Sequence, residues 1–162
     1  MQISNSIKLI AYDCDGVLTD NRVLLDEFGK EYVFFNRGDG YAISQIKSIL
    51  GVTQVVISTE TNPIVKKRCE KLKIDVMFGI KDKASAIKEY CSKIGVDLEQ
   101  VMFIGNDLND LSAMAIVGVR GCPADAEREI LEISDWVATS RGGWGVVREL
   151  YRFLCKDCEM VE

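Results

Sequence analysis

Short apolar segments alternate with helix-like segments along the whole chain, and this alternation limits the folds that the chain can adopt. Strand-like segments lie at residues 9–11, 52–57, 75–78, 101–104, 117–120 and 136–139. Between them, apolar residues recur every three or four positions, which is typical of helices that bury one face. This alternation predicts a central, mostly parallel sheet with helices on both faces. A length of 162 residues without repeats or low-complexity linkers fits a single α/β domain over residues 1–162.

One additional element follows the first strand. Residues 21–36 contain two further strand-like segments, around Val23–Leu25 and Glu31–Phe35, and Gly29 between them can supply the positive φ of a hairpin turn. A two-stranded hairpin is only marginally stable by itself. Its apolar side chains therefore predict packing against another surface, such as a second subunit. Because this hairpin is the only extra element, we expect no large cap domain over the site.

Polar side chains gather where three of the predicted strands end. The clusters are Asp13 and Asp15, Ser58 and Thr59, and Asn106 and Asp107. In parallel sheets, ligands bind at the carboxyl ends of the strands, so these clusters predict one common site. Carboxylates beside a glycine turn suit a hard cation such as Mg²⁺. Either aspartate of the first cluster could also act as a nucleophile or a proton donor. A turn rich in Asx residues is the simpler interpretation of Asp13 and Asp15 alone.

The composition excludes several classes of function. The chain has no histidine, which rules out a Ser-His-Asp triad, a Cys-His dyad and metal sites with imidazole ligands. The net charge is -5 and no lysine- or arginine-rich run is present, so we expect no nucleic-acid partner. No segment approaches the ~20 apolar residues of a membrane span. The N-terminus lacks the pattern of a secretory signal, and the expected location is the cytoplasm.

The six cysteines are scattered along the chain, several of them at core-facing positions of predicted helices. We therefore expect free thiols. Cys155 and Cys158 form a single C-x-x-C pair without a second pair or a histidine, so a zinc site is not expected there.

The segment D-C-D-G-V-L-T-D at residues 13–20, directly after an apolar strand, resembles motif I of the haloacid dehalogenase (HAD) superfamily of aspartate-nucleophile phosphatases. The resemblance implies a three-layer Rossmann-like fold. Asp13 matches the nucleophile that forms an aspartyl-phosphate, and Asp15 matches the general acid and base. Ser58 matches the phosphate-binding hydroxyl of motif II, and Lys83 matches the motif III lysine, whose charge offsets those of the phosphate and the nucleophile.

Motif IV of the superfamily, which completes the Mg²⁺ site, corresponds to G-N-D-x-x-D at residues 105–110. The implied metal ligands are Asp13, Asp15, Asn106 and Asp107. Asn106 departs from the pattern, since most relatives have a ligating aspartate there. A carboxamide oxygen can bind Mg²⁺ but carries no charge. Whether Asn106, Asp107 or Asp110 ligates the metal stays open at this point.

Further segments resemble the capless branch that includes 3-deoxy-D-manno-octulosonate 8-phosphate phosphatase. They are F-N-R-G-D-G, I-S-T-E-T-N-P-I-V, G-N-D-L-N-D, P-A-D-A and G-G-W-G-V-V-R-E. This resemblance implies a 2-keto-3-deoxy sugar acid phosphate as the substrate. It also implies a homotetramer in which a neighbour's hairpin covers each site. The implied substrate-binding residues are Thr59, Glu60, Arg68, Arg37, Gly38 and Asp39.

Several of these segments are closer to the phosphatase-like domain attached to acylneuraminate cytidylyltransferases and to nonulosonate 9-phosphate phosphatases. Glu60 stands where octulosonate phosphatases typically carry arginine. We expect Glu60 to repel a nearby substrate carboxylate and Arg68 to be the carboxylate partner, which favours a nine-carbon substrate. Glu127 stands where relatives often have histidine, and no consequence follows from it.

Two other functions remain open at the level of sequence. A HAD-like module without catalysis, which supports tetramer formation or assists a cytidylyltransferase, is motivated by Asn106 and by the match to fused domains. A general scavenger of small phosphate esters is the other, and it would act on unrelated sugar phosphates at comparable rates.

Overall fold

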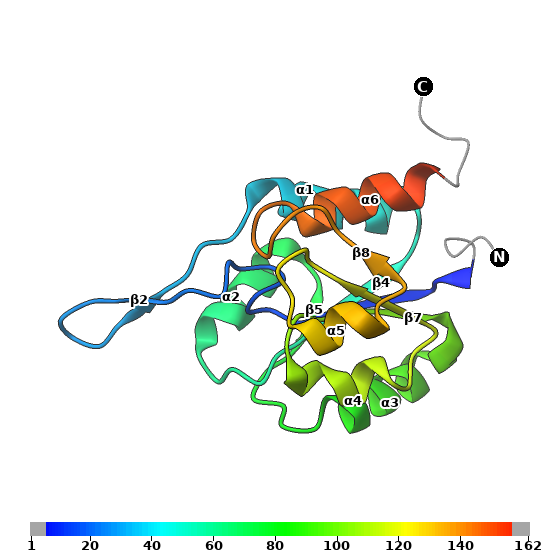
Figure 1. Cartoon of the computed structure of the whole chain (residues 1–162), viewed down its shortest axis with the longest axis horizontal. Coiled ribbons are helices and arrows are strands. Elements are labelled where there is room, and N and C mark those ends of the chain that lie inside the picture. The colour runs from blue at the N-terminus through cyan, green and yellow to red at the C-terminus, as the bar shows by residue number, and fades with distance from the viewer. Residues whose placement is uncertain (1–5, 157–162) are drawn as a thin grey trace.

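The computed structural model describes residues 6–156, and its main feature is a six-stranded parallel sheet with strand order β5-β4-β1-β6-β7-β8 (Figure 1). The strands are β1 (Leu9–Tyr12), β4 (Thr53–Ile57), β5 (Asp75–Met77), β6 (Val101–Ile104), β7 (Val119–Cys122) and β8 (Trp136–Val137). Tyr12, the last residue of β1, pairs in register with Val56 of β4 and Ile104 of β6. The carboxyl ends of these three neighbouring strands therefore meet at one edge of the sheet, as the sequence predicts.

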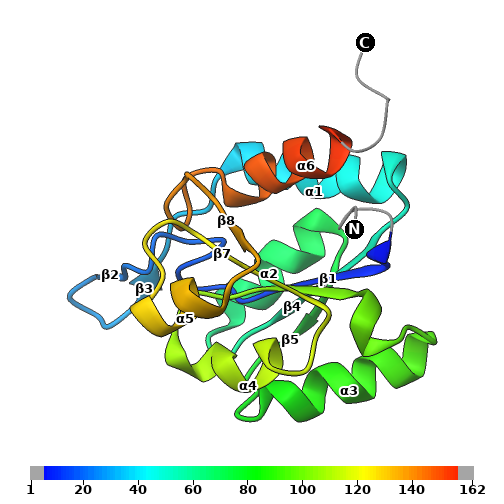
Figure 2. The ribbon, with the colours of Figure 1, turned by 45° about the vertical axis from the view of Figure 1, so that its right-hand side comes forward.

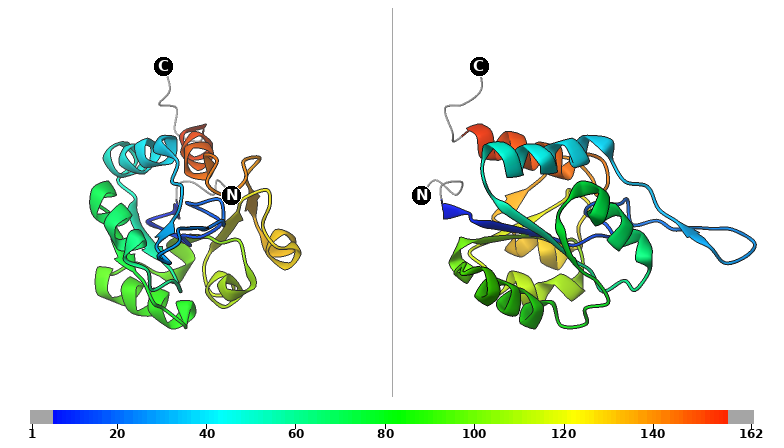
Figure 3. Two further views of the ribbon diagram at one scale, coloured as in Figure 1. Left: turned by 90° about the vertical axis from the view of Figure 1, so that its left-hand side faces the viewer. Right: turned by 180° about the vertical axis from the view of Figure 1, so that it is seen from behind.

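Helices cover both faces of the sheet, which confirms the three-layer architecture (Figures 2 and 3). Ile10 and Tyr12 of β1 contribute to the core beneath α1 (Arg37–Ile49), α2 (Pro63–Leu72) and α6 (Val146–Lys156). Leu9 and Ala11 contribute to the opposite core, beneath α3 (Lys83–Ile94), α4 (Leu111–Met114) and α5 (Arg128–Ile133). This alternation follows from the two-residue period of a strand whose faces are both buried. No helix within residues 6–156 is long and apolar enough to cross a membrane.

The predicted hairpin is present and extends away from the rest of the molecule (Figure 1). Its strands, β2 (Leu24–Leu25) and β3 (Glu31–Tyr32), pair antiparallel and are shorter than the sequence suggests. Gly29 has φ +77° as expected. The apolar side chains remain largely solvent-exposed in the single chain, and Phe28 at the turn is 87% exposed. The short pairing is consistent with a hairpin that gains little from its own contacts.

Asn62 followed by Pro63, and Asp82, are typical of the first positions of helices and predict two helix starts next to the site, which the structure confirms. Asn62 caps α2 by accepting the backbone N–H of Ile64, and Pro63 is the first helical residue. Asp82 caps α3 through the backbone N–H of Ser85. These caps are local in sequence and satisfy N–H groups that have no partner within the helix.

Other predicted boundaries need correction. The strand expected at residues 117–120 is β7 at Val119–Cys122. Gly118 lies against the 3₁₀ helix η2 (Leu98–Gln100), where a Cβ atom would clash with the Glu99 backbone, and its N–H donates to the Leu98 carbonyl oxygen at 2.9 Å. Strand pairing begins at Val119. The sequence also favours a helix around residues 125–132, but α5 begins at Arg128, and the N–H of its capping residue Glu127 donates to the Asn106 carbonyl oxygen. Ile49 shares the helical spacing of Ile43 and Ile46, which predicts the buried face of α1, yet it is 45% exposed.

The five cysteines within the described residues are free and buried, as expected. Cys158 lies outside the described residues, so the expectation that Cys155 and Cys158 form no metal site stays a prediction.

Candidate active site

Lys83 links two of the sequence clusters through a buried ion-pair triad. Its Nζ lies 2.8 Å from Asp13 Oδ1 and 2.6 Å from Asp110 Oδ1. Lys83 and Asp110 are fully buried, and Asp13 is 5% exposed. Burial of an ammonium group is costly unless partners surround it. Although burial acts against it, the carboxylates of Asp13 and Asp110 raise the pKa of Lys83 above its usual value.

The surroundings of Asp13 favour the protonated form of its carboxyl group more than water does for an exposed aspartate. Burial, followed by the charge of Asp110, raises the pKa of Asp13 to about 7, while Lys83 opposes the rise. Asp13 directly follows β1, and its backbone N–H donates to the Ile104 carbonyl oxygen at 2.9 Å. A buried carboxylate at the end of a central strand, held by a cation, is a suitable position for a nucleophile.

Asp110 has a structural task that the sequence did not reveal. Besides pairing with Lys83, its Oδ2 accepts the backbone N–H groups of Asn106 at 2.9 Å and Asp107 at 3.2 Å. Gly105 is required beside it, since a Cβ atom there would lie 2.7 Å from the Asp110 carboxylate. Asp110 therefore holds the turn after β6 and the Lys83 ammonium together. From the sequence, Asp110 was an alternative metal ligand, but both of its carboxylate oxygens already have partners within the protein.

Polar atoms of two segments, the loop after β1 and the turn after β6, meet at Asp13 Oδ2. One end of the Asn106 carboxamide lies 3.2 Å from this atom and 2.9 Å from the backbone carbonyl oxygen of Asp15. With the carboxamide oxygen at that end, the set is a carboxylate, a backbone carbonyl and an amide, which are ligand types that Mg²⁺ accepts. Asp15 would then contribute its backbone rather than its carboxylate. The residues present thus fit a magnesium ion, although no cluster of three His, Cys, Asp or Glu side chains suited to a metal occurs in residues 6–156.

Asp107, the remaining predicted ligand, is exposed, and its Oδ1 accepts the backbone N–H of Leu108 at 2.6 Å. It caps the short 3₁₀ helix η3 (Leu108–Asp110). Its contact with a metal stays a prediction.

The carboxylate of Asp15 is half-buried and points toward a different set of partners. Its Oδ1 accepts a hydrogen bond from Thr19 Oγ1 at 3.1 Å. Burial raises the pKa of Asp15, Thr19 opposes the rise, and the charges of Glu60 and Glu31 add to it. A carboxyl group that retains its proton more readily than usual is suited to act as a general acid.

Ser58 and its neighbours form the loop between β4 and α2. Ser58 is 1% exposed and its Oγ accepts the backbone N–H of Glu60 at 3.1 Å, which leaves the hydroxyl hydrogen free to donate. Glu60 Oε1 accepts the N–H groups of Thr61 and Asn62, at 2.7 and 2.9 Å. Thr59 is exposed, and its Oγ1 accepts a long hydrogen bond of 3.5 Å from Asn109 Nδ2.

The base of the hairpin lies beside this loop. Asn62 Nδ2 donates to Glu31 Oε2 at 2.8 Å. A small hollow of about 40 Å³ between them is lined by residues of motif I, the hairpin and the start of α2, namely Cys14, Asp15, Val23, Glu31, Val33, Phe35, Glu60, Asn62, Ile64 and Val65. A wider, open hollow of about 590 Å³ shares Glu31 and Glu60 with it and reaches Lys30. The chain's own hairpin therefore borders its own site, a relationship with no signal in the sequence.

The other predicted substrate-binding residues lie at the start of α1, where they have structural contacts. Asp39 is 3% exposed and its Oδ1 accepts the backbone N–H of Arg148 at 2.9 Å, in the first turn of α6. Gly38 donates its N–H to the capping Asn36 Oδ1 at 2.7 Å. Arg37, the first residue of α1, is exposed.

Arg68 reaches this region from α2. It donates to the Asn36 carbonyl oxygen at 3.2 Å, and its guanidinium lies 5.2 Å from the centre of the Phe35 ring. The contacts of Arg68, Arg37, Gly38 and Asp39 with a substrate stay predictions.

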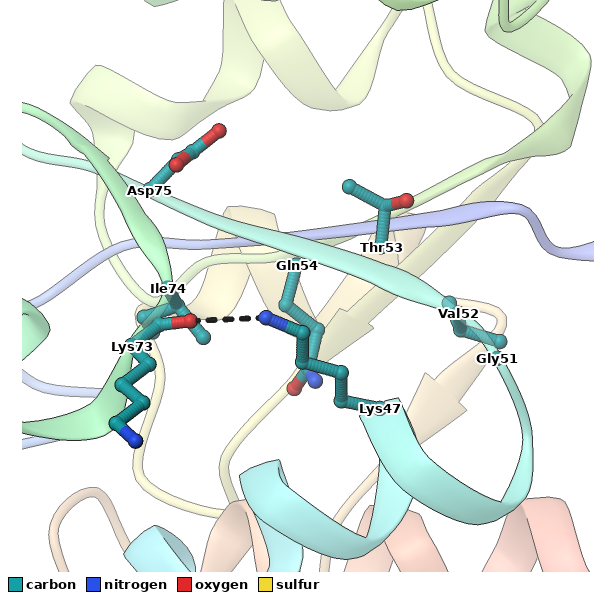
Figure 4. A pocket seen from close by; sticks show the side chains of 8 residues that line it. All are labelled: Lys47, Gly51, Val52, Thr53, Gln54, Lys73, Ile74 and Asp75. Atoms are coloured by element: carbon teal, nitrogen blue, oxygen red, sulfur yellow. Dashed lines mark hydrogen bonds between the residues drawn. The ribbon is translucent and has the colours of Figure 1, made fainter.

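A hollow of about 400 Å³ lies at the opposite end of the sheet, around the amino ends of β4 and β5 (Figure 4). Several of its polar side chains have hydrogen-bond partners within the protein. Lys47 Nζ donates to the Lys73 carbonyl oxygen at 3.2 Å, while Gln54 bonds the Tyr12 hydroxyl and the Ile43 carbonyl oxygen. The polar groups around Asp13 make the other end of the sheet the better candidate for catalysis.

Comparison with known proteins gives the same assignment. Residues 58–150 match the family model of haloacid dehalogenase-like hydrolases. The 3-deoxy-D-manno-octulosonate 8-phosphate phosphatase KdsC of Escherichia coli is 31% identical over 151 residues, which are 93% of this chain and 80% of the relative.

Two solved structures show the same fold. The 3-deoxy-D-manno-octulosonate 8-phosphate phosphatase of Yersinia pestis superposes with a TM-score of 0.93 at 30% identity, covering 98% of this chain and 85% of its own. The enzyme of the same name from Moraxella catarrhalis, in complex with magnesium, phosphate and KDO, gives a TM-score of 0.91 at 30% identity, with coverages of 96% and 89%. These matches confirm the resemblance drawn from the motifs, the Rossmann-like fold and Mg²⁺ as the cofactor. The chain therefore belongs to the haloacid dehalogenase-like hydrolases, as a phosphatase of the 3-deoxy-D-manno-octulosonate 8-phosphate phosphatase family.

Proposed function

We propose that this protein hydrolyses the terminal phosphate ester of a 2-keto-3-deoxy sugar acid through an aspartyl-phosphate on Asp13. The observation that carries the proposal is the position of Lys83 Nζ, 2.8 Å from Asp13 Oδ1 and at the carboxyl edge of the parallel sheet. A cation at this point offsets the negative charges of a carboxylate and a phosphate that must approach each other. The candidate substrates are 3-deoxy-D-manno-octulosonate 8-phosphate and a nonulosonate 9-phosphate.

In the first step, a carboxylate oxygen of Asp13 attacks phosphorus and the bond from phosphorus to the sugar oxygen breaks. The proton of Asp15 passes to the leaving alkoxide, which departs as an alcohol. In the second step, Asp15 takes a proton from water, whose oxygen attacks phosphorus and releases inorganic phosphate and free Asp13. When bound, Mg²⁺ supplies positive charge next to the phosphoryl oxygens.

The loop after β4 would hold the transferring phosphoryl group. Ser58 Oγ already accepts the N–H of Glu60, so its own hydrogen can point to a phosphate oxygen. The amino end of α2 adds the favourable end of the helix dipole. Lys83, buried and anchored by Asp110, keeps its charge at a fixed place throughout the reaction.

We further propose that nonulosonate 9-phosphates are preferred over octulosonate 8-phosphate. Glu60 and Glu31 both act on Asp15 electrostatically, so the entrance beside Asp15 carries several negative charges. A substrate that places its carboxylate there is repelled, whereas hydroxyl groups can donate hydrogen bonds to the same carboxylates. A longer substrate can extend its carboxylate beyond Glu60, toward a cation such as Arg68 or one from a neighbouring subunit.

The assembly that we propose is a homotetramer, formed by a single-domain protein of the cytoplasm. The support is the exposed apolar surface of the hairpin, which includes Leu24, Leu25 and Phe34. Such a surface is costly in water and is typical of an interface. A neighbour's hairpin over each site would supply a lid. A functional link to a cytidylyltransferase stays a prediction from sequence.

The deciding experiment measures phosphate release by the purified protein with Mg²⁺ from the two candidate acids and from unrelated sugar phosphates. We expect kcat/KM to be at least roughly tenfold higher for the 2-keto-3-deoxy acids than for unrelated sugar phosphates, because polar groups of the site form hydrogen bonds and ion pairs with the substrate. Comparable rates on all sugar phosphates would instead identify a general scavenger. Absence of turnover on every compound would favour the non-catalytic module.

A further inference from the structure

Asn106 lies at the point where the segments of the proposed metal site meet. One end of its carboxamide is 3.2 Å from Asp13 Oδ2 and 2.9 Å from the Asp15 carbonyl oxygen. The other end faces Gly16, where a Cβ atom would lie 2.1 Å from Asn106 Nδ2. The side chain is buried, with 6% of the residue exposed. Two orientations of the carboxamide fit this space, and they differ by a half-turn about χ2.

The two orientations present opposite chemistry to Asp13 and Asp15. With the nitrogen toward them, both distances are those of N–H···O hydrogen bonds, and one group satisfies two acceptors. With the oxygen toward them, three oxygens face one another and repel unless a cation lies among them. An aspartate at this position could offer only the second arrangement.

The backbone of Asn106 is fixed, so a change between these orientations involves the side chain alone. Its N–H donates to Asp110 Oδ2 at 2.9 Å, and its carbonyl oxygen accepts the N–H of Glu127 at 2.8 Å. Asp110 is itself held by Lys83. The turn after β6 is therefore anchored on both sides of the carboxamide.

We propose that Asn106 serves the site in two ways. Without a cation, its nitrogen holds the Asp13 carboxylate and the Asp15 carbonyl oxygen together. With Mg²⁺, the carboxamide turns over and its oxygen becomes a ligand. Binding of Mg²⁺ then breaks two hydrogen bonds, and the carboxamide is a neutral ligand. Mg²⁺ therefore binds more weakly than it would with an aspartate at position 106. In return, the site keeps its geometry when the metal leaves. This inference concerns the metal site and does not depend on the identity of the sugar acid.

The test compares Asn106→Asp with Asn109→Asp, a matched control that adds the same charge on an exposed residue of the same turn. Isothermal titration calorimetry gives the Kd for Mg²⁺, and thermal unfolding gives Tm in EDTA and in Mg²⁺. We expect Asn106→Asp to bind Mg²⁺ roughly tenfold more tightly or better. We also expect it to have a lower Tm than the wild type in EDTA, and Asn109→Asp to change both quantities much less. A Kd for Asn106→Asp that equals the wild-type value, or an unchanged Tm in EDTA, would overturn the proposal.

A second measurement uses the wild-type protein and remains decisive if Asn106→Asp does not fold. In a ¹⁵N NMR spectrum, the side-chain NH₂ group of Asn106 should be protected from hydrogen exchange in EDTA, because the group is buried and has two hydrogen-bond acceptors. Titration with Mg²⁺ should shift this signal and remove its protection, in parallel with the calorimetric binding curve. A signal that is unprotected in EDTA, or that Mg²⁺ leaves unchanged, contradicts the proposed rotation of the Asn106 carboxamide.

Discussion

Lys83 Nζ and Asp110 Oδ1 lie 2.6 Å apart, and neither residue is accessible to solvent. The lysine is the first residue of α3 and the aspartate ends the 3₁₀ helix η3, so one ion pair joins the third and fourth segments of the active site. Because Asp110 also accepts the N–H groups of Asn106 and Asp107, this pair fixes the turn and the cation at once.

Asp110→Asn should therefore reduce both stability and catalysis. Lys83 would keep Asp13 as its only charged partner, and we expect a loss of about 2–3 kcal/mol in the free energy of unfolding. We expect kcat to fall more than KM rises, since the substrate does not touch Asp110. Urea unfolding and steady-state kinetics measure the two effects. Glu129→Gln, which removes an exposed charge on α5, is the control and should change neither. A fully stable and active Asp110→Asn protein would show that the pair does not position Lys83.

Asp13→Asn should abolish turnover and leave the fold intact, because Asp110 still pairs with Lys83. We expect kcat to fall by roughly 10³-fold or more, since an amide cannot form the acyl-phosphate. Acid quenching during turnover should trap a phosphorylated protein from the wild type only, and circular dichroism should be unchanged. Substantial phosphate release by Asp13→Asn would exclude the aspartyl-phosphate mechanism.

The raised pKa of Asp13 predicts an unusual pH dependence of activity. The nucleophile must be ionised, and burial together with Asp110 raises its pKa to about 7. At low Mg²⁺ concentration, kcat/KM should therefore decrease as the pH falls through about 7, well above the range of an ordinary aspartate. Saturating Mg²⁺ favours the ionised form of Asp13 and should move this decrease in kcat/KM to lower pH. A decrease that occurs near pH 4 and does not respond to Mg²⁺ would contradict the prediction.

The same group links stability to pH in the metal-free protein. A folded-state pKa above the unfolded value means that the folded protein binds the proton more tightly. The contribution of Asp13 to stability is therefore present at low pH and is lost as the pH rises through about 7. Thermal unfolding in EDTA between pH 5 and 8 should show this loss in the wild type, and Asp13→Asn should lack it. Parallel curves for the two proteins would assign the dependence to other groups.

Glu60→Arg should shift substrate preference toward octulosonate 8-phosphate. The substitution replaces repulsion of a nearby carboxylate by attraction, so the ratio of kcat/KM values for the eight- and nine-carbon substrates should rise roughly tenfold or more. Glu129→Arg carries the same change of charge on an exposed residue of α5 and serves as the control. If the wild type already prefers octulosonate 8-phosphate and the ratio stays the same in Glu60→Arg, then Glu60 does not select the substrate.

The hairpin should hold the assembly together. Sedimentation of the wild type at micromolar concentration should give a tetramer, and Leu24→Asp combined with Phe34→Asp should dissociate it. Ile49→Asp changes a similarly exposed apolar residue on α1 and should leave the assembly intact. A wild-type monomer with full activity would rule out both the assembly and the role of a neighbour's hairpin as a lid.

Much of the fold could be predicted from sequence because its signals are local. The first strand (expected at residues 9–11, observed at Leu9–Tyr12), the caps Asn62 and Asp82, and the positive φ of Gly29 each depend on neighbouring residues only. The meeting of three polar clusters followed from the parallel sheet, in which the carboxyl ends of strands share one edge.

Contacts between distant segments could not be predicted in the same way. The pairing of Lys83 with Asp110 depends on how α3 packs beside α4. Asp15 lies next to Asn106 through its backbone oxygen and not through its carboxylate. Arg68 was expected at the substrate, yet its hydrogen bond is to the Asn36 carbonyl oxygen. The residue types show which reactions the side chains could perform, whereas only the packing shows which of these side chains already have hydrogen-bond or ion-pair partners within the protein.

The hydrogen bond between Glu31 and Asn62 connects the base of the hairpin to the start of α2. A displacement of the hairpin would therefore also move the loop that is expected to hold phosphate. In a screen of random variants scored by turnover alone, substitutions at the hairpin would be mistaken for damage to the catalytic residues. Separating the two kinds of defect requires that each inactive variant be tested for its oligomeric state as well.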